Sequence, residues 1–390
     1  MKTEEKENSK NKRQATLLKK KISEFKEVTT KSITDCNAVY LVGHKNPDFD
    51  SIASLGAMAL VCKRLKKAPY IVMDQEDIEK LENDNDKYYE HEMMEKIKEK
   101  FVVINLSDYE SNKQDNSLLI VLDTNAYFRT PFKNHYQDFK KILVLDHHCV
   151  DDNTIKANNK LILHDCASSC SEIMYWLLKQ YRITPSDVDY YTFLLIGINL
   201  DTKKGTKSNT MPSTRDCISE LLELRKADPV KADLFLNPAY ESVRKSYELF
   251  NKANWLTLRY AIAVDNENVY TKKEVAYAAD LMESFVCEAA IFCGKNKDGK
   301  YEVSARSNRG NVDIAYIMRE LNGGGGSLSN ASCDPIYIDA EGELENKKLL
   351  DEIKDIIYLK NNGQKQKQMP RKRYYIKSKN IKKKNKEDDE

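Results

Sequence analysis

Short apolar runs alternate along the chain with longer segments in which apolar residues recur at helical spacing. Five such runs, rich in Val, Ile and Leu, lie before residue 150. This alternation predicts strands joined by crossover helices in a parallel sheet. The predicted strands are CNAVYLVG (36–43), APYIVM (68–73), KFVVINL (100–106), SLLIVLD (117–123) and KILVLD (141–146).

Helical periodicity marks four segments between and after these runs. The last of them opens with Thr-Pro-Ser at 184–186, a start signal of the kind that caps a helix. The predicted helices are 51–67, 86–100, 171–182 and 184–200.

A second alternation of strands and helices follows a polar stretch. Residues 237–254 form this stretch and predict a connecting helix between two domains. The turn NKDG at 296–299 predicts a hairpin between two of the later strands. The later strands are predicted at 260–270, twice within 288–307 and at 336–340, and the later helices at 270–284 and 312–321.

Length and charge favour two domains with charged ends. The 390 residues can bury a sizeable core, and the net charge of +2 is spread unevenly. About thirty residues at each end are rich in Lys and poor in large apolar side chains, so we expect solvated tails there. The expected divisions are a charged N-terminal segment (1–32), a catalytic domain (33–232), a linker helix (233–255), a second domain (256–345) and a basic, disordered tail (346–390).

Two further observations concern the compartment. No window approaches the roughly 18 apolar residues that a spanning helix requires, and the start MKTEEKENSKNKRQ lacks the apolar core of a signal peptide. The nine cysteines include no C-x-x-C pair, which argues against a disulfide framework and a cysteine zinc site. We therefore expect a cytoplasmic protein whose cysteines are reduced packing residues.

Candidate metal ligands stand where apolar segments leave the core. The stretch GHKNPDFDS (43–51) follows the first predicted strand, and further acidic residues and histidines follow later apolar segments. In open α/β sheets ligands collect beyond the carboxyl ends of the strands, so we expect these side chains to converge. The candidates are His44, Asp48, Asp50, Asp123, Asp146, His147, His148 and Asp201.

The donor types predict which metal would bind. Carboxylates and imidazoles without thiolates suit Mn²⁺, and less well Mg²⁺, Fe²⁺ or Zn²⁺. Four Asp and two His side chains can hold two cations about 3.5 to 4 Å apart with one carboxylate bridging. Enzymes that catalyse in-line displacement at a phosphorus atom use this arrangement. A single Asp after a strand is more often a turn or capping residue, but four such segments in one chain favour the metal site.

The motifs GHKNPDFDS, VLDTN, LDHH and GINLDTK, in that order and spacing, resemble those of the DHH phosphoesterase superfamily. The stretch AADLMES to SNAS (278–332) resembles the DHH-associated C-terminal domain, and its SARS and glycine run are most similar to cyclic di-AMP phosphodiesterases of the GdpP type. CASSCSE (166–172) is similar to that family's YASSxxE. The resemblance covers about residues 35–340. It implies an α/β fold, with a parallel-sheet DHH domain that carries helices on both faces, linked to a smaller α/β substrate-binding domain.

The resemblance also implies a metal-ligand set and a reaction. The family's membrane helices and its sensor and degenerate cyclase-like domains have no counterpart here, so the chain resembles the catalytic module alone. The implied activity is hydrolysis of cyclic di-AMP to linear pApA by a water that two Mn²⁺ ions activate. The implied ligands are His44 and Asp48 for one ion, Asp50, His147 and Asp201 for the other, and Asp123 as the bridge.

Two further residues near the metals have implied catalytic roles. His148 would face the substrate phosphate or the leaving 3′ oxygen, and Asp146 would orient the histidines. For substrate binding, Arg306 offers a planar donor fork, and the glycine run lets backbone N–H groups approach a phosphate. The implied substrate contacts are Ser168, Ser169, Glu172, Ser304, Arg306, Ser307, Gly324, Gly325, Gly326, Ser327 and Asn330.

One position departs from the family pattern, and it leaves alternatives open. Ser327 stands where relatives have a His after the glycine run, so we expect altered nucleotide recognition before loss of activity. The alternatives are a nanoRNase or phosphoadenosine phosphatase acting on short linear oligonucleotides, and a non-catalytic nucleotide-binding regulator. A manganese pyrophosphatase fits less well because its second domain lacks this glycine run.

The basic tail raises the question of nucleic-acid partners. It carries Tyr374 and Tyr375 among Lys and Arg residues, a composition that can attract RNA through counterion release. A disordered solubilising tail is the alternative. A homodimer is likewise an open expectation, and no membrane span is expected.

Overall fold

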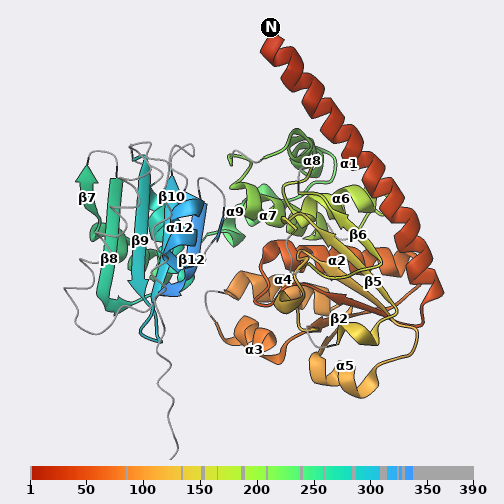
Figure 1. The fold of residues 1–390 in the computed structure, drawn as a ribbon. Helices are drawn as coiled ribbons and strands as arrows, with labels where there is room; N and C mark the ends of the chain where they lie inside the picture. Colours follow the sequence, from red (N-terminus) through yellow and green to blue (C-terminus); the bar gives the residue numbers. More distant parts are fainter. Residues whose placement is uncertain are drawn as a thin grey trace, which may run out of the picture. The chain divides into compact units, whose positions relative to one another are not determined.

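Two units make up the chain, residues 1–242 and residues 243–390 (Figure 1). The structure, a computed structural model, describes residues 2–84, 87–132, 135–150, 154–164, 166–185, 189–207, 210–237, 240–257, 260–282, 287–307, 314–322, 325–326 and 330–336. Among these residues, no helix combines the length and the apolar character needed to cross a membrane. Each unit has a six-stranded sheet of its own.

The sheet of the first unit is parallel throughout, as the sequence predicts. Its strand order is β3-β2-β1-β4-β5-β6, so the direction of winding reverses between β1 and β4. Such a reversal leaves a crevice at the carboxyl ends of the two strands, where ligands bind in open α/β sheets. The strands are β1 (Val39–Val42), β2 (Pro69–Met73), β3 (Val102–Asn105), β4 (Leu118–Leu122), β5 (Lys141–Asp146) and β6 (Asn159–Ile162).

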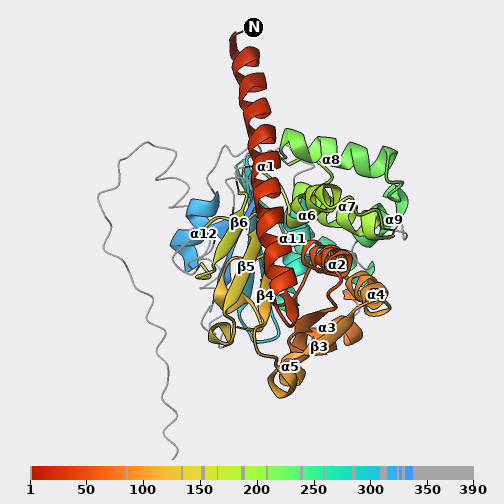
Figure 2. The same cartoon turned by 90° about the vertical axis from the view of Figure 1, so that its right-hand side faces the viewer.

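Helices cover both faces of this sheet because its strands are apolar on both sides. In β1, Leu41 packs with one core and Tyr40 with the other. The larger core lies under α1 (Lys2–Asp35), α2 (Phe49–Arg64), α4 (Tyr88–Lys98), α6 (Cys170–Gln180) and α7 (Asp189–Thr202), whereas α5 (Leu106–Asn112) and the loops around 3-10 helices η2 (Tyr127–Arg129) and η3 (Tyr136–Asp138) cover the smaller one (Figures 1 and 2).

The N-terminal helix differs from the solvated segment expected at residues 1–32. Leu18, Ile22, Phe25 and Ile33 are buried on α1, which runs along α6 and the end strand β6 (Figure 2). These residues recur at helical spacing and form one apolar stripe. The many Lys residues between them hid this stripe, since long charged side chains occupy the remaining faces of the helix.

The second unit combines antiparallel and parallel strand pairs. Its sheet has the order β11-β12-β10-β9-β8-β7, in which only β8 and β9 are parallel among the described pairs. The predicted hairpin joins β9 to β10, and Gly299 in its turn has φ 76°, which favours glycine. The strands are β7 (Asn254–Thr257), β8 (Tyr260–Val269), β9 (Ala289–Lys295), β10 (Tyr301–Ser307), β11 (Gly325–Gly326) and β12 (Asn330–Ile336).

Helices lie on both faces of this second sheet. Helix α12 (Ile314–Asn322) packs with Ile262 and its neighbours, and α10 (Tyr240–Asn251) and α11 (Lys272–Leu281) pack with Ala261 on the opposite face. The predicted connecting helix is α10, and the boundary between the units falls within it. Of the strand predicted at 336–340, only Ile336 is described, as the last residue of β12, and the tail 346–390 lies outside the described residues.

The sequence did not indicate several short helices. They include α3 (Gln75–Asn83), α8 (Pro212–Glu223) and α9 (Pro229–Phe235). Each begins after a residue with an extended backbone, and Pro opens α8 and α9. The cysteines agree with the prediction, since all nine are free and all but Cys149 are buried.

Candidate metal site

The first part of the site is the loop between β1 and α2. Asp48 caps α2, because its Oδ1 accepts hydrogen bonds from the backbone N–H groups of Asp50 (3.0 Å) and Ser51 (3.1 Å). His44 lies four residues earlier in the loop, and its Nε2 is 3.6 Å from the same Oδ1. The cap therefore fixes both Asp48 and the start of the helix that carries Asp50.

Two contacts from outside the loop hold its backbone in place. Asn46, whose φ is 52°, donates its N–H to Oδ1 of Asp77 (2.9 Å). The ammonium of Lys87, nearly fully buried beside Glu90, donates to the carbonyl of Pro47 (2.9 Å). Sequence analysis missed Asp77 and Lys87, because a charged residue on a polar helix gives no sign that it will be buried.

Asp123 lies at the end of β4, next to β1 at the reversal of strand order. The residue is 2% exposed, and its backbone has φ 59°. A residue other than glycine in this left-handed region is uncommon, and Asp is among the few that tolerate it. Its Oδ2 lies 3.4 Å from Nε2 of His44, and its Oδ1 lies 3.5 Å from Nε2 of His147. Asp123 thus faces ligand candidates from two different loops.

The end of β5 supplies Asp146, His147 and His148. Asp146 is fully buried, and its carboxylate accepts hydrogen bonds from the backbone N–H of His147 (2.8 Å) and from Nδ2 of Asn125 (2.6 Å). It also pairs with Nδ1 of His148 at 2.8 Å. With these three partners, Asp146 is positioned to orient the two histidines, whereas His147 turns its Nε2 toward Asp123.

Asp50 and Asp201 complete the arrangement. The carboxylate of Asp50 accepts hydrogen bonds from the backbone N–H groups of Cys170 (2.8 Å) and Ser171 (2.7 Å), the first two residues of α6. This places a carboxylate at a helix N-terminus, where it is favoured. Nε2 of His147 lies 3.8 Å from Oδ2 of Asp50 and 3.3 Å from Oδ2 of Asp201, in the last turn of α7.

The structure thus brings together all six predicted metal ligands. Three of their atoms are buried without a hydrogen-bond partner among the described residues, namely Oδ1 of Asp123, Nε2 of His147 and Oδ2 of Asp201. Buried polar atoms are rarely left unpaired, because losing contact with water costs about 1 to 3 kcal/mol. These atoms face one another, so a divalent cation among them would satisfy all three. The donor set fits such an ion, since it consists of carboxylates and imidazoles.

The protonation of the cluster reflects this crowding of carboxylates. Burial opposes the charged form of His147, but Asp123, Asp201 and Asp50 outweigh burial and raise its pKa to about 10. In the same way, Asp123 and Asp48 raise the pKa of His44 well above its usual range.

The carboxyl groups shift in opposite directions. Burial raises the pKa of Asp201 to about 6, and burial together with Asp123 and Asp201 raises that of Asp50 well above its usual range. The histidines, against the effect of burial, lower the pKa of Asp123. Protons on the imidazoles thus balance the carboxylates in the metal-free site, and a bound cation would take over that role.

The predicted substrate contacts of the first unit occupy the interior. Ser168, Ser169 and Glu172 are nearly or fully buried. Ser169 caps α6 by accepting from the N–H of Glu172 (3.1 Å), and Glu172 accepts from the N–H of Ser168 (2.9 Å) and from the hydroxyl of Thr214 (2.6 Å). In this arrangement the CASSCSE motif builds the helix start that holds Asp50.

The predicted substrate contacts of the second unit lie on β10 and after α12. The guanidinium of Arg306 is buried, and it donates to Asp280 (2.6 Å) and to the hydroxyl of Ser304 (2.9 Å). Ser304 and Ser307 are also buried. Gly324 and Ser327 lie outside the described residues. Of Gly325, Gly326 and Asn330 the backbone is described, in β11 and at the start of β12.

Residues 38–198, which carry all of the metal-ligand candidates except Asp201, match the model of the DHH family, N-terminal domain. This segment belongs to the DHH family. The family domain therefore begins just before β1 and ends within α7.

Curated proteins and solved structures resemble larger parts of the chain. The cyclic-di-AMP phosphodiesterase GdpP of Bacillus subtilis is 29% identical over 81% of this chain and 48% of its own length. The cyclic-di-AMP phosphodiesterase PdeA of Listeria monocytogenes is 29% identical over 80% of this chain and 47% of its own length. The chain thus spans about half the length of these relatives. An exopolyphosphatase-related protein from Bacteroides fragilis shares the fold, with a TM-score of 0.65, 16% identity and coverage of 87% of this chain and 97% of its own.

Proposed function

We propose that this chain is a phosphodiesterase that uses Mn²⁺ to hydrolyse cyclic di-AMP to linear pApA. The observation that carries this proposal is the cluster of buried metal-ligating atoms without a hydrogen-bond partner among the described residues. In it, Nε2 of His147 faces Oδ1 of Asp123 at 3.5 Å and Oδ2 of Asp201 at 3.3 Å. The names of the relatives GdpP and PdeA support the choice of substrate.

The six ligand candidates divide into two groups around Asp123. His44 and Asp48 would hold one divalent cation, and Asp50, His147 and Asp201 would hold a second. Asp123 would serve both, because its two oxygens face His44 and His147 separately. When bound, the two cations would lower the pKa of the attacking water and neutralise the charge that develops on the phosphoryl oxygens.

His148 is the residue that we assign to proton transfer. Its side chain is 47% exposed, and its Nδ1 is engaged with the buried Asp146. Nε2 is therefore the atom that can donate a hydrogen bond to the phosphate or a proton to the leaving 3′ oxygen. Asp146 keeps the ring in that orientation, as a carboxylate behind a catalytic histidine does.

Substrate recognition is assigned to the second unit. We propose that the glycine run around Gly325 and the serines beside Arg306 contact the nucleotide, with Ser327 and Asn330 close by in the sequence. The guanidinium of Arg306 already has Asp280 as a partner, so its contribution would come from positioning β10 or from an exchange of partners.

The experiment that tests this function is a chromatographic analysis of products. The purified chain with Mn²⁺ is given cyclic di-AMP, linear pApA and a short oligoribonucleotide in parallel. We expect pApA to accumulate from the cyclic substrate, and no product to form with Asp123→Asn. Cleavage of the linear substrates alone would contradict the proposed substrate and support a nanoRNase, and cleavage of none would leave a nucleotide-binding regulator.

A further inference from the structure

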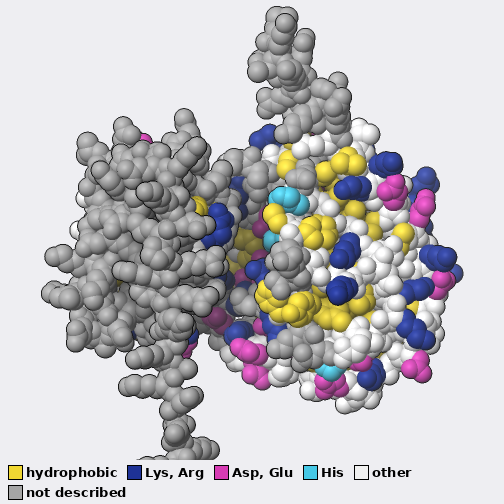
Figure 3. Space-filling model, viewed as in Figure 1, with side chains coloured by type: hydrophobic (Ala, Val, Ile, Leu, Met, Phe, Trp, Pro, Cys, Tyr) yellow, Lys and Arg dark blue, Asp and Glu magenta, His cyan; other side chains and the backbone are white. Residues whose placement is uncertain are grey.

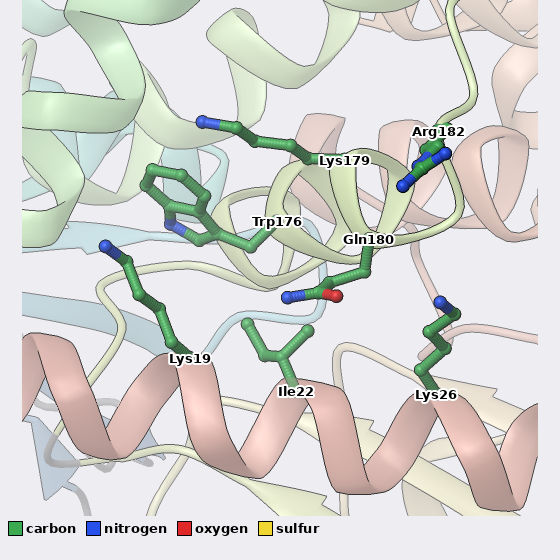
Figure 4. Close-up of a pocket in the computed structure, with 7 residues that line it drawn as sticks. All are labelled: Lys19, Ile22, Lys26, Trp176, Lys179, Gln180 and Arg182. Carbon is green, nitrogen blue, oxygen red and sulfur yellow. The ribbon is translucent and has the colours of Figure 1, made fainter.

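A groove lies between helices α1 and α6 of the first unit, and none of the metal-ligand candidates lines it. Its volume is about 380 Å³, and the cations around it are Lys19, Lys26, Lys179 and Arg182 (Figure 4). Helix α6 holds Asp50 at its first residues, whereas the groove begins at Trp176. At a rise of 1.5 Å per residue, roughly 9 Å of helix separates the two places. The groove is therefore distinct from the metal site.

The lining of the groove has four positive charges and no acidic side chain. Lys179 pairs with Glu220 at 2.7 Å, but within the described part of the chain no carboxylate lies in ion-pair distance of Lys19, Lys26 or Arg182. Lys179, in the last turn of α6, is favoured there by the helix dipole. That effect does not explain Lys19 and Lys26, which come from the middle of α1 and lie on one face of it, seven residues apart.

The grouping of cations bears on which ligands the groove attracts. On the face of the first unit shown in Figure 3, Lys and Arg side chains are interspersed with apolar and acidic ones. Like charges gathered around one hollow create a positive potential that attracts anions. The groove thus has the electrostatic character of an anion site.

An aromatic ring and an amide add to the charges. Trp176 lies between the cations, with Nζ of Lys179 5.0 Å from its ring centroid. Its indole N–H is buried and interacts with the carboxylate of Glu172. Figure 4 shows the amide of Gln180 pointing into the space above Ile22. The Gln180 amide suits a ligand with acceptor groups, and an aromatic ring suits a nucleobase.

We propose that this groove binds a nucleotide phosphate, either free or as part of an RNA strand. The cations stand at both ends of the groove, Lys19 and Lys179 near Trp176, and Lys26 and Arg182 at the other end (Figure 4). When the cations bind the phosphate of a nucleotide, the base of that nucleotide lies beside Trp176 and Gln180. A bare inorganic anion would use the charges but neither the ring nor the amide.

Tryptophan fluorescence tests this proposal at the groove itself. The chain has two tryptophans, so Trp255→Phe leaves Trp176 as the only reporter. Full-length protein with this change and with Asp123→Asn, which prevents hydrolysis, is titrated with AMP, a short oligoadenylate and inorganic phosphate. We expect saturable quenching by AMP if the source is a free nucleotide, and by the oligoadenylate alone if the source is RNA.

A pair of double variants supplies the control. Lys19→Gln with Lys26→Gln should weaken binding about tenfold or more and reduce its dependence on salt. Lys20→Gln with Lys31→Gln changes the same helix and the same charge at exposed positions, and should alter affinity by less than about twofold. Circular dichroism confirms that both variants fold. The proposal is overturned by equal affinity of the two variants, by the absence of quenching, or by inorganic phosphate that binds as tightly as AMP.

Discussion

Nε2 of His147 lies 3.3 Å from Oδ2 of Asp201, which joins the end of strand β5 to the last turn of helix α7. The two residues are far apart in the sequence, and each, like the nearby Asp123, has a buried polar atom without a hydrogen-bond partner among the described residues. Folding thus brings several potential metal ligands together in one buried place. This is the physical basis for expecting a cation there, and the following predictions depend on it.

Removing the charge of Asp123 should abolish activity while leaving the fold intact. Asn is the suitable replacement, since it tolerates the left-handed backbone at this position, where Ala is strained. We expect kcat to fall by about 100-fold or more, because both cation sites lose a charged ligand. Thermal unfolding should change little. Turnover near the wild-type rate would contradict the bridging role of Asp123.

Asp50 and Asp201 should differ in their effect on stability. Asp50→Ala leaves the N–H groups of Cys170 and Ser171 without their acceptor, so we expect a loss of about 2 to 4 kcal/mol in the free energy of unfolding. Asp201→Ala removes a side chain that is 25% exposed, and we expect less than about 1 kcal/mol. Both variants should lose activity. Denaturant unfolding with equal stabilities would show that Asp50 does not anchor the start of α6.

Metal binding should release protons and strengthen as the pH rises. The carboxylates hold the pKa of His147 at about 10, so this imidazole is charged at neutral pH and must lose its proton to bind a cation. Between pH 6 and 9 the affinity for Mn²⁺ should therefore increase by up to about tenfold per pH unit for each proton released. Calorimetry in two buffers of different ionisation enthalpy counts these protons. Affinity that does not change with pH would disprove this protonation pattern.

Arg306 should contribute to the stability of the second unit. Its side chain is 7% exposed and donates to Asp280 at 2.6 Å. Arg306→Ala should lower the unfolding free energy by about 1 to 3 kcal/mol, because it leaves a largely buried network incomplete. If Arg306 also binds substrate, KM rises while kcat changes little. Unfolding and KM that are both unchanged would remove Arg306 from either role.

Much of the first unit could be predicted from the sequence because its signals are local. A buried strand of a parallel sheet is a short apolar run in the sequence, and β1 to β5 all lie within the predicted segments, including β3, which is partly exposed. The ligand candidates follow such runs directly, and the carboxyl ends of parallel strands meet at one edge. The sheet topology alone was therefore enough to predict that these side chains converge.

Other features depend on tertiary contacts that no local pattern shows. The apolar stripe of α1 is interrupted by Lys residues, and its burial becomes apparent only against α6. Ser169 and Glu172 were expected to contact substrate, yet they support the helix start that holds Asp50. The burial of Arg306 depends on Asp280, which lies on a different element of the second unit.

Anomalous diffraction from crystals soaked in Mn²⁺ tests the central claim most directly. At the manganese edge, we predict two peaks in the first unit. One should lie among His44, Asp48 and Asp123, and the other among Asp123, Asp50, His147 and Asp201. Crystals of Asp123→Asn should lose at least one of these peaks. No peak within this cluster, or manganese bound only elsewhere, would contradict the two-cation site on which the proposed phosphodiesterase depends.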